Sequence, residues 1–302
     1  MRHLKVISGI AWSFSIFSRA IALAWLAALP GGALAASLKP ETRAAFERYV
    51  QLTDQRNAAE LSANHKFLWI DSLDPLARQN AYQSLDAGAL EISQRETLNE
   101  GKPISCPNGL IHHWIGLIFV RGVTLDEVLH TLQDYNHHAV YYGPDVQQSR
   151  IESRDGAHFR VFMRFRRTEV ITVVIDTVND IQYFRDSPDR ARSRSSAIRV
   201  NEVENPGARN EREDPAGQDD GFLWGMETWW RMEEKNGGVY IQSEVVSLTR
   251  DIPSGLGWLV GPFVNSIPKE SLTFTLQATR RAVLSAKLSG EIAAAGEQVS
   301  PD

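Results

Sequence analysis

Residues 223–249 read LWGMETWWRMEEKNGGVYIQSEVVSLT, and two alternating runs within them decide the fold. Side chains of an extended chain point to opposite faces in turn, so residues that share a parity share a face. In the first run the even positions form such a face: Trp224, Met226, Thr228, Trp230 and Met232. Asn236 and Gly237 then supply a tight reversal, and the alternation resumes at Val239. The stretch therefore predicts a β-hairpin with one half-buried face and charged residues on the other.

The hairpin is followed by a change of period. After the glycine-rich residues 254–257, apolar side chains recur at helical spacing from Trp258 to Leu288. Proline fits the first turn of a helix and disrupts its interior, so we expect the helix to begin beside Pro268. Chain ends fray unless something ties them down, and we predict a disordered tail over residues 289–302.

The order of these segments is shared with a known superfamily. The features that match are Trp230-Arg231-Met232-Glu233-Glu234, Gly237-Gly238-Val239-Tyr240, Glu244, Ser247-Leu248, Pro253 and the terminal helix. Together they resemble the helix-grip superfamily of START-like lipid-transfer domains, pollen-allergen-type ligand carriers and polyketide cyclases, over about residues 104–288. The resemblance implies an α+β fold in which a curved antiparallel β-sheet wraps around a long C-terminal α-helix. It implies a fold more firmly than a function, because one fold hosts many functions.

The chain before the predicted sheet is helical in character. Between Ser37 and Asn64, apolar residues recur at steps of three and four among charged ones. Asp74 and Pro75 then match the cap and first position of a second helix. We therefore assign residues 36–100 to an N-terminal helical extension packed on the domain, and residues 101–288 to the START-like domain.

The region between the extension and the hairpin predicts an antiparallel meander. Leu110 to Arg121 alternates as a strand, and Thr124 with Glu127 forms a capping box for the helix that follows. Alternating runs separated by turn residues continue to Glu204 and give about seven strands. Residues 205–220, rich in proline, glycine and acidic side chains, predict a long exposed loop.

Residues 1–35 have the layout of a secretory signal peptide. Arg2 and Lys5 precede an apolar core, and Ala33-Leu34-Ala35 places small residues at the spacing that a signal peptidase uses. The alternative is an uncleaved membrane anchor, but the uncharged run is shorter than the roughly 20 residues that a span needs. We expect cleavage near Ala36 and a periplasmic or secreted protein. Because Cys106 is the one cysteine and lies far from that site, we expect neither an internal disulfide nor a lipid anchor.

Composition and motifs exclude several classes of function. The 302 residues are 43% hydrophobic and 23% charged, which is ordinary for a globular protein. Without the three basic residues of the predicted signal, 29 basic residues face 37 acidic ones, so we expect no nucleic-acid partner. No phosphate loop, dinucleotide fingerprint or Gly-x-Ser-x-Gly elbow occurs. Ser266 and Lys269 have the serine–lysine spacing of penicillin-recognising enzymes, but the companion motifs of those enzymes are absent.

Two adjacent histidine pairs, His112-His113 and His137-His138, raise the question of a metal site, because imidazole is a common zinc ligand. Neighbouring strand residues point to opposite faces, so at most one of His112 and His113 can face a cavity. The sequence does not indicate a residue that would be the third metal ligand. We predict no bound metal and no other cofactor.

Six arginines fall on matching positions of two predicted strands: Arg160, Arg164, Arg166, Arg190, Arg192 and Arg194. One interpretation is a solvated outer face on which each arginine pairs with an acidic residue across strands. The other is a basic patch that docks anionic lipid headgroups, which would add transient contact with a membrane surface.

The inner face of the predicted hairpin has the composition of a ligand pocket. Thr228, Ser243 and Ser247 share that face with Trp230, and small-molecule pockets are mostly apolar with a few polar groups. With the aromatic and apolar residues expected to face the same space, the ligand-binding candidates are Trp114, Tyr135, Tyr141, Met163, Thr228, Trp230, Met232, Ile241, Ser243 and Ser247.

Three functions fit this pattern. The leading hypothesis is an exported carrier that holds a hydrophobic small molecule, such as a lipid, quinone or polyketide-like compound, between the sheet and the C-terminal helix. The second is a cyclase- or hydrolase-like enzyme in the same cavity, with Glu227, Glu244 and His113 as acid–base candidates. The parity that points Trp230 and Ser243 inward points both glutamates outward, which weakens the enzyme hypothesis. The third is a structural or interaction module with a filled core.

Overall fold

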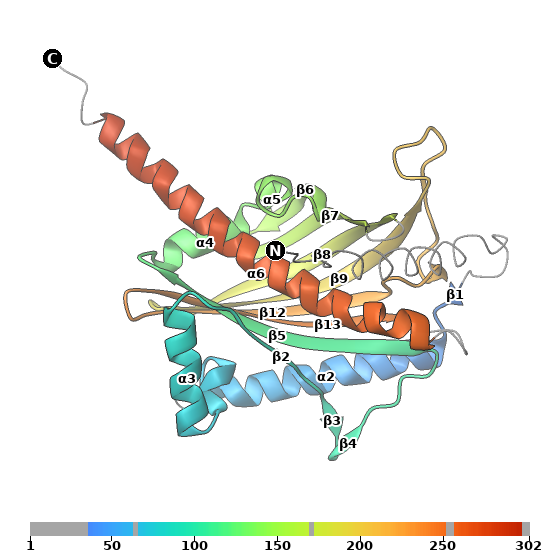
Figure 1. The fold of residues 1–302 in the computed structure, drawn as a ribbon. Helices are drawn as coiled ribbons and strands as arrows, with labels where there is room; N and C mark the ends of the chain where they lie inside the picture. Colours follow the sequence, from blue (N-terminus) through green and yellow to red (C-terminus); the bar gives the residue numbers. More distant parts are fainter. Residues whose placement is uncertain (1–35, 63–65, 169–171, 252–256, 298–302) are drawn as a thin grey trace, which may run out of the picture.

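The computed structural model describes residues 36–62, 66–168, 172–251 and 257–297. The predicted signal peptide, residues 1–35, lies outside these ranges, so cleavage near Ala36 stays a prediction. Figure 1 shows one large sheet crossed by a long helix, with the shorter helices at its two ends.

The main sheet is an antiparallel meander in which the first long strand of the chain pairs with the last one. Its order is β2-β5-β13-β12-β9-β8-β7-β6, with the short strand β10 paired to β9. The strands are β2 (Glu91–Gln94), β5 (Gly109–Arg121), β6 (Val146–Asp155), β7 (His158–Thr168), β8 (Thr172–Ser187), β9 (Arg190–Glu204), β10 (Arg212–Glu213), β12 (Gly225–Lys235) and β13 (Gly238–Arg250). From β6 to β13 the strands follow chain order, and β5 returns to pair with β13. Irregular register between β8 and β9 and between β6 and β7 bends the sheet, as β-bulges do.

Smaller pairs lie outside this sheet. Strand β1 (Ala36–Ser37) pairs with β11 (Gln218–Asp219), and β3 (Leu98–Asn99) pairs with β4 (Lys102–Pro103). Because β10 and β11 lie within residues 205–220, the segment predicted as an exposed loop carries two short strands. Strand β2 belongs to the predicted N-terminal extension but hydrogen-bonds to β5, so the extension supplies an edge of the main sheet.

The predicted hairpin is β12–β13. Asn236 and Gly237 have φ angles of 58° and 75°, the left-handed conformation that a two-residue hairpin turn needs. The pairing runs without a register shift from Gly225 opposite Leu248 to Lys235 opposite Gly238. Local turn chemistry and alternation were therefore sufficient to predict this element.

The C-terminal helix α6 (Gly257–Glu297) is longer than the sequence indicated at both ends. It begins well before Pro268, which lies inside it, and it continues through residues 289–297, where we predicted disorder. Leu272, Leu276 and Val283 of this helix are buried in the core. Packing of this kind, rather than local propensity, supplies most helix stability, so the helix persists although Pro268 lies in its interior.

Helix α6 lies closest to the sheet at β5. A Cβ atom on Gly116 would stand 2.5 Å from Cδ1 of Leu276, so the absence of a side chain there lets the helix approach. Figure 1 shows α6 crossing the sheet diagonally. The described contacts of α6 with the sheet are mainly with β5, β13 and β2, whereas residues 135–141 pack on β6 at the far side of the sheet.

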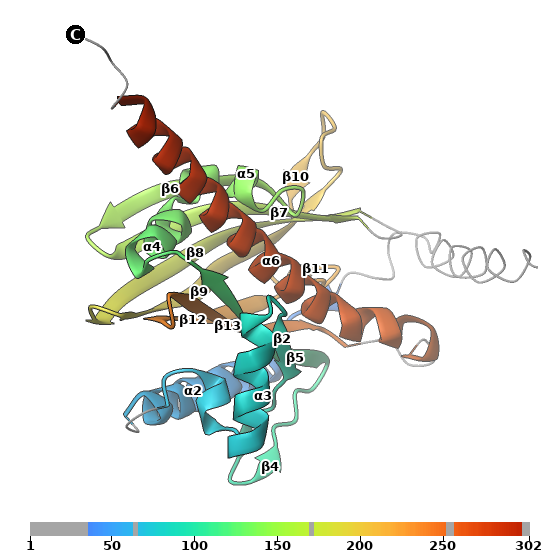
Figure 2. The same ribbon diagram turned by 60° about the vertical axis from the view of Figure 1, so that its left-hand side comes forward.

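Helix α4 (Leu125–Gln133) covers one end of the inner face. Its start has the predicted capping box, in which the Thr124 hydroxyl accepts from the Glu127 amide and the Glu127 carboxylate accepts from the Thr124 amide. Its apolar stripe packs with α6 over the turn end of the hairpin. The short helices η2 (Tyr135–His137) and α5 (His138–Tyr141) follow it. Figure 2 shows α4 and α5 toward the β6–β7 end and α2 and α3 at the β2–β5 end.

The outer face of the sheet at β5, β12 and β13 is covered by the N-terminal extension, which the sequence predicted to pack on the domain without indicating the face. Helix α2 (Pro40–Ser62), the turn η1 (Trp69–Ser72) and helix α3 (Pro75–Asp86) lie over it. The charged residues on the outer face of β12, including Arg231, are consequently buried. Arg231 donates to the backbone oxygen of Phe67 and pairs with Glu60 at 2.8 Å. Full pairing allows these charges to be buried. The α+β helix-grip fold is confirmed, with a second layer behind its sheet.

Candidate functional site

A cavity of about 370 Å³ lies between α6 and the sheet. Strands β5, β13, β12, β9, β8 and β7 supply its floor, α6 supplies its roof, and the segment from Leu132 to Tyr142 closes one end. A volume of this size is typical of small-molecule sites.

Cross-strand register explains why hydroxyl groups gather on the floor. In one row Ser193, Trp230 and Ser243 lie opposite one another on β9, β12 and β13. The next row has Ser195, Thr228 and Val245 in the same order and ends at Trp114 on β5. A third row pairs Met226 with Ser247 and Ser247 with His112. Residues directly opposite on one face are neighbours, so each row brings hydroxyl groups beside apolar side chains on the floor.

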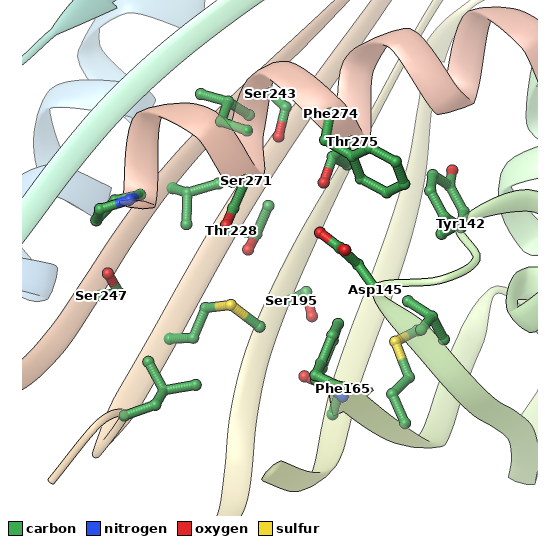
Figure 3. A pocket seen from close by; sticks show the side chains of 18 of the residues that line it. Tyr142, Asp145, Phe165, Ser195, Thr228, Ser243, Ser247, Ser271, Phe274 and Thr275 are labelled. Atoms are coloured by element: carbon green, nitrogen blue, oxygen red, sulfur yellow. The ribbon is translucent and has the colours of Figure 1, made fainter. Parts of the chain in front are cut away.

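The roof adds polar groups of the same kind. Ser271 and Thr275 are four residues apart on α6 and so lie on one helix face. Figure 3 shows both side chains, with Phe274, above the strands that carry Ser243 and Thr228. The cavity is therefore an apolar space with hydroxyl groups on both walls.

The closed end is aromatic and contains Tyr135, His138, Tyr142 and Tyr183. Tyr135 and Tyr183 share a hydrogen bond of 2.8 Å between their hydroxyl oxygens, and burial raises the pKa of each phenol. The ring of His138 is also buried, and burial lowers its pKa to about 4. All four groups are consequently neutral near pH 7.

The other end opens to solvent beside Arg166 and Phe222, which are exposed members of the lining. Arg167 bridges the opening because its guanidinium reaches Asp145 at 3.2 Å and Glu270 on α6 at 3.0 Å. Figure 3 shows the Asp145 side chain directed toward the space below α6. These ion pairs connect the β6–β7 side of the sheet to the helix across the mouth.

Two buried polar atoms at the cavity lack a partner in the described structure. One is the hydroxyl oxygen of Ser243, a residue that is 1% exposed, and the other is Nε2 of His138, which is 6% exposed. A buried polar group without a hydrogen bond costs free energy, so these two atoms are unsatisfied groups beside the cavity.

Seven of the ten predicted ligand-binding residues line the cavity: Trp114, Tyr135, Met163, Thr228, Trp230, Ser243 and Ser247. Met232 and Ile241 do not, because they pair at the turn end of the hairpin and are sealed under α4 and α6. Tyr141 also lies elsewhere and donates its hydroxyl proton to Asp134 at 2.6 Å. Its neighbour Tyr142 turns inward instead.

The sequence analysis missed several lining residues. Ser193 and Ser195 alternate with arginines on a predicted strand, so parity alone could have found them once the inward face of β9 was known. Ser271 and Thr275 are spaced by one helical turn, which is a usable signal. No local sequence pattern indicated that His138 lines the cavity, because its burial depends on the packing of α5 against the sheet.

The proposed acid–base residues lie on the opposite face of the sheet from the cavity. Glu244 accepts from His113 at 2.6 Å and from Asn57 at 3.1 Å, and Glu227 accepts from Ser196 at 2.7 Å. His112, which is adjacent to His113, lines the cavity. The alternation therefore separates the two histidines as expected, and it removes the three acid–base candidates from the site.

The six arginines are largely paired with acidic residues. Arg190 pairs with Glu233, Arg192 with Asp186 and Arg194 with Asp54 and Glu227. Arg164 pairs with Asp176 and Glu211, and Arg160 with Glu152. Arg166 differs from these, because it lies at the cavity mouth. Cross-strand pairing therefore accounts for most of the series.

In the described part of the chain, no group of three or more histidine, cysteine or acidic side chains is arranged to hold a metal ion. Within the same ranges, no helix combines the length and apolar character that a membrane crossing requires.

No protein-family model and no curated protein matches this sequence. Solved structures similar to it include the STAR-related lipid transfer protein, fragment 25–204, of Xanthomonas axonopodis, with 17% identity, coverage of 64% of this chain and 98% of that chain, and a TM-score of 0.40. The Zhui aromatase/cyclase of Streptomyces sp. R1128 has 12% identity, coverage of 59% and 94%, and a TM-score of 0.36. A START superfamily protein of Mycobacterium smegmatis has 9% identity, coverage of 59% and 97%, and a TM-score of 0.35.

Because the identities are 17% or lower and the TM-scores 0.40 or lower, these similarities carry no information about the ligand or activity of this protein. The fold rests instead on the strand order of this chain, on β5 closing the meander against β13, and on α6 lying across the inner face. The protein has the helix-grip fold, with a cavity between the curved sheet and helix α6.

Proposed function

We propose that this protein binds and carries a hydrophobic small molecule in the cavity under α6. The observation that carries the proposal is a space of about 370 Å³, open at one end, whose lining is mostly apolar with spaced hydroxyl groups on its floor and roof. Burial of ligand carbon there would supply affinity at about 25 cal/mol per Å² of apolar surface removed from water. The hydroxyl rows on β9, β12 and β13 would orient polar atoms of the ligand.

The geometry favours a carrier over the other two hypotheses. An enzyme using Glu227, Glu244 or His113 would need these groups at the ligand, and they lie behind the sheet among α2 side chains. A structural module would need a filled core, and the space beneath Ser271 and Thr275 is not filled by side chains. The hydroxyl residues of the lining, among them Ser195, Thr228 and Ser271, support an occupant with polar atoms.

We also propose that the carrier acts outside the cytoplasm. The support is the order of Arg2 and Lys5, an apolar core and Ala33-Leu34-Ala35 in the sequence. Amino-terminal sequencing of the protein from its natural source tests this point, and a chain that still begins at Met1 would contradict export by cleavage.

Native mass spectrometry of protein purified without detergent tests the carrier function. We expect a population with the added mass of an apolar small molecule, which organic extraction removes. The extracted protein should then bind the neutral apolar dye Nile red with increased fluorescence. A protein that carries no small molecule and takes up no dye would leave the structural module as the better interpretation.

A further inference from the structure

A group of hydroxyl side chains at the cavity makes no hydrogen bond within the described part of the chain. The half-buried serine and threonine residues of the lining are Ser195, Thr228, Thr249, Ser271 and Thr275. Thr249 donates its proton to the backbone oxygen of Arg250 at 3.2 Å. The other four hydroxyl groups have no partner among the described residues, and we call these four residues the hydroxyl belt.

The two belt residues on α6 differ from other hydroxyl residues of this helix. Serine and threonine in a helix commonly donate to the carbonyl oxygen four residues earlier. Thr273 donates in this way to Lys269 at 2.8 Å, and Thr279 donates to the backbone of Thr275 at 2.9 Å. The side chains of Ser271 and Thr275 line the cavity and make no such bond in the described structure. Their protons are therefore available to a ligand.

The floor half and the roof half of the belt face each other across the cavity. Thr228 and Ser195 are directly opposite on β12 and β9, with Cβ atoms about 5 Å apart. Ser271 and Thr275 are one helical turn apart, about 5–6 Å. Figure 3 shows both α6 side chains directed toward the strands that carry Thr228 and Ser195. A ligand between the helix and the sheet therefore meets hydroxyl groups on both sides.

Apolar side chains flank the belt. On the inner face of β12, Thr228 lies between Trp230 and Met226. Ser193 and Ser247 also lie in these flanking rows, but they are only 4% and 8% exposed, so little of either residue faces the space. The order along the cavity is therefore apolar, polar, apolar.

We propose that the cavity selects neutral molecules with an apolar segment on each side of a central ester or ketone group, and that the hydroxyl belt donates hydrogen bonds to this group. The proposal rests on the carrier function and specifies its ligand class. A carbonyl oxygen has two lone pairs and no charge, which matches hydroxyl groups whose protons are free. An ionised group fits this position less well, because Asp145 is directed into the same space and a buried anion needs a cationic partner.

Displacement of Nile red by two isomeric esters, hexyl heptanoate and methyl dodecanoate, tests the proposal. The isomers bury nearly the same apolar surface, but the carbonyl is central in the first and near one end in the second. Methyl dodecanoate can bring its carbonyl to the belt only by leaving one side of the cavity unfilled. We expect hexyl heptanoate to bind about fivefold more tightly, the factor that corresponds to one hydrogen bond of average net strength.

Thr228→Val and Thr275→Val remove belt hydroxyl groups and nearly keep the shape of each side chain. Combined in one protein, they should bring hexyl heptanoate to the affinity of methyl dodecanoate, while Nile red binding persists. Thr273→Val is the matched control, because this threonine is on the same helix, donates to Lys269 and does not line the cavity. This control should keep the fivefold preference. The affinity for Nile red is measured separately in each variant.

A second measurement detects the hydrogen bond directly. Hexyl heptanoate with an isotope-labelled carbonyl gives an infrared band whose frequency falls when the oxygen accepts a hydrogen bond. We expect a lower frequency for the ester bound to the wild-type protein than for the ester in hexane. In the combined Thr228→Val and Thr275→Val protein, the frequency should return to the value in hexane.

The outcomes separate this proposal from the carrier function. Equal binding of the two esters, or a bound carbonyl band at its hexane frequency, with Nile red still bound, would overturn the proposal and leave a carrier without this preference. Failure of Nile red and both esters to bind would overturn the carrier function as well. Loss of the preference in Thr273→Val would also contradict the proposal, because this hydroxyl lies outside the cavity. Its retention there, with its loss in the combined variant, would support the role of the belt.

Discussion

His113 on β5 and Glu244 on β13 form a hydrogen-bonded pair behind the cavity, with 2.6 Å between Nε2 and Oε1. Tyr49 of α2 donates to the other ring nitrogen at 2.9 Å, because the neutral ring gives its one proton to Glu244 and its second nitrogen can only accept. Arg56, also on α2, contacts the same carboxylate. Burial alone raises the pKa of Glu244, but the hydrogen bond from His113 and the charge of Arg56 outweigh it and lower the pKa to about 2. Helix α2 is thus fixed to the sheet by a buried ionised glutamate.

Replacing Glu244 by Gln should lower the free energy of unfolding by about 3–5 kcal/mol, because it leaves buried partners without their charge. Urea denaturation measures the change. Glu213→Gln is the control, since this residue is exposed and its pairing with Arg199 contributes about 0–1 kcal/mol. Nile red binding should survive in whatever fraction remains folded, because Glu244 faces away from the cavity. An unchanged unfolding free energy would show that the network does not hold α2.

The two adjacent tryptophans of β12 should behave differently. Trp229 is buried against α2 and donates from Nε1 to Asp54 at 2.7 Å, so Trp229→Ala should cost about 3–5 kcal/mol of stability. Trp230 is only half-buried and lines the cavity, so Trp230→Ala should cost less stability and weaken ligand binding more. Denaturation and dye titration of both variants give the comparison. Equal effects in both assays would contradict the assignment of the two faces.

Filling the cavity should abolish binding while preserving the fold. Ser195 on β9 is half-buried and lies on the cavity floor, so Ser195→Trp should occupy ligand volume with a small change in melting temperature. Ile198→Trp, at an exposed position of the same strand, is the matched control. If the space is in fact closed, the new ring must overpack it, at about 1–3 kcal/mol, and the melting temperature should drop.

Arg167 should control ligand exchange rather than affinity. Arg167→Ala removes the ion pairs to Asp145 and Glu270 that bridge the mouth, so stopped-flow release of Nile red should become faster. These pairs are partly exposed, and their loss should change stability by no more than about 1 kcal/mol. Arg212→Ala, which breaks an exposed pair with Glu204 away from the cavity lining, should leave the release rate unchanged. Equal release rates in wild type and Arg167→Ala would rule out a gate at this position.

We expect the free energy of unfolding to depend on pH through His138. Its folded pKa, lowered by burial to about 4, lies below the ordinary value of 6.5, so between these values the unfolded state binds a proton that the folded state does not. The free energy of unfolding should therefore fall as pH decreases from 6.5 toward 4, by about 3 kcal/mol from this group. Denaturation at several pH values should show a smaller decline in His138→Phe. The same decline in both proteins would mean that His138 is not the group responsible.

The sequence by itself determined the elements whose causes are local. Asn236 and Gly237 specify the hairpin turn through their tolerance of positive φ, and Thr124 with Glu127 specifies a helix start. Alternation fixed which residues of β12 and β13 share a face, and this is why Thr228, Ser243 and Ser247 were identified in advance as neighbours at one cavity.

Tertiary structure alone decided how far each face is covered, because covering elements come from distant parts of the chain. Alternation placed Met232 and Ile241 on the cavity face, but α4 seals that end, so they became core instead of lining. It placed Glu244 outward, but α2 buries it and supplies Arg56 as its partner. The position of α6 on Gly116 left the space over β9 and β12 open, and the packing of α5 turned His138 into it. Periodicity reports the direction of a side chain, whereas burial and cavity shape depend on packing between elements that no local pattern encodes.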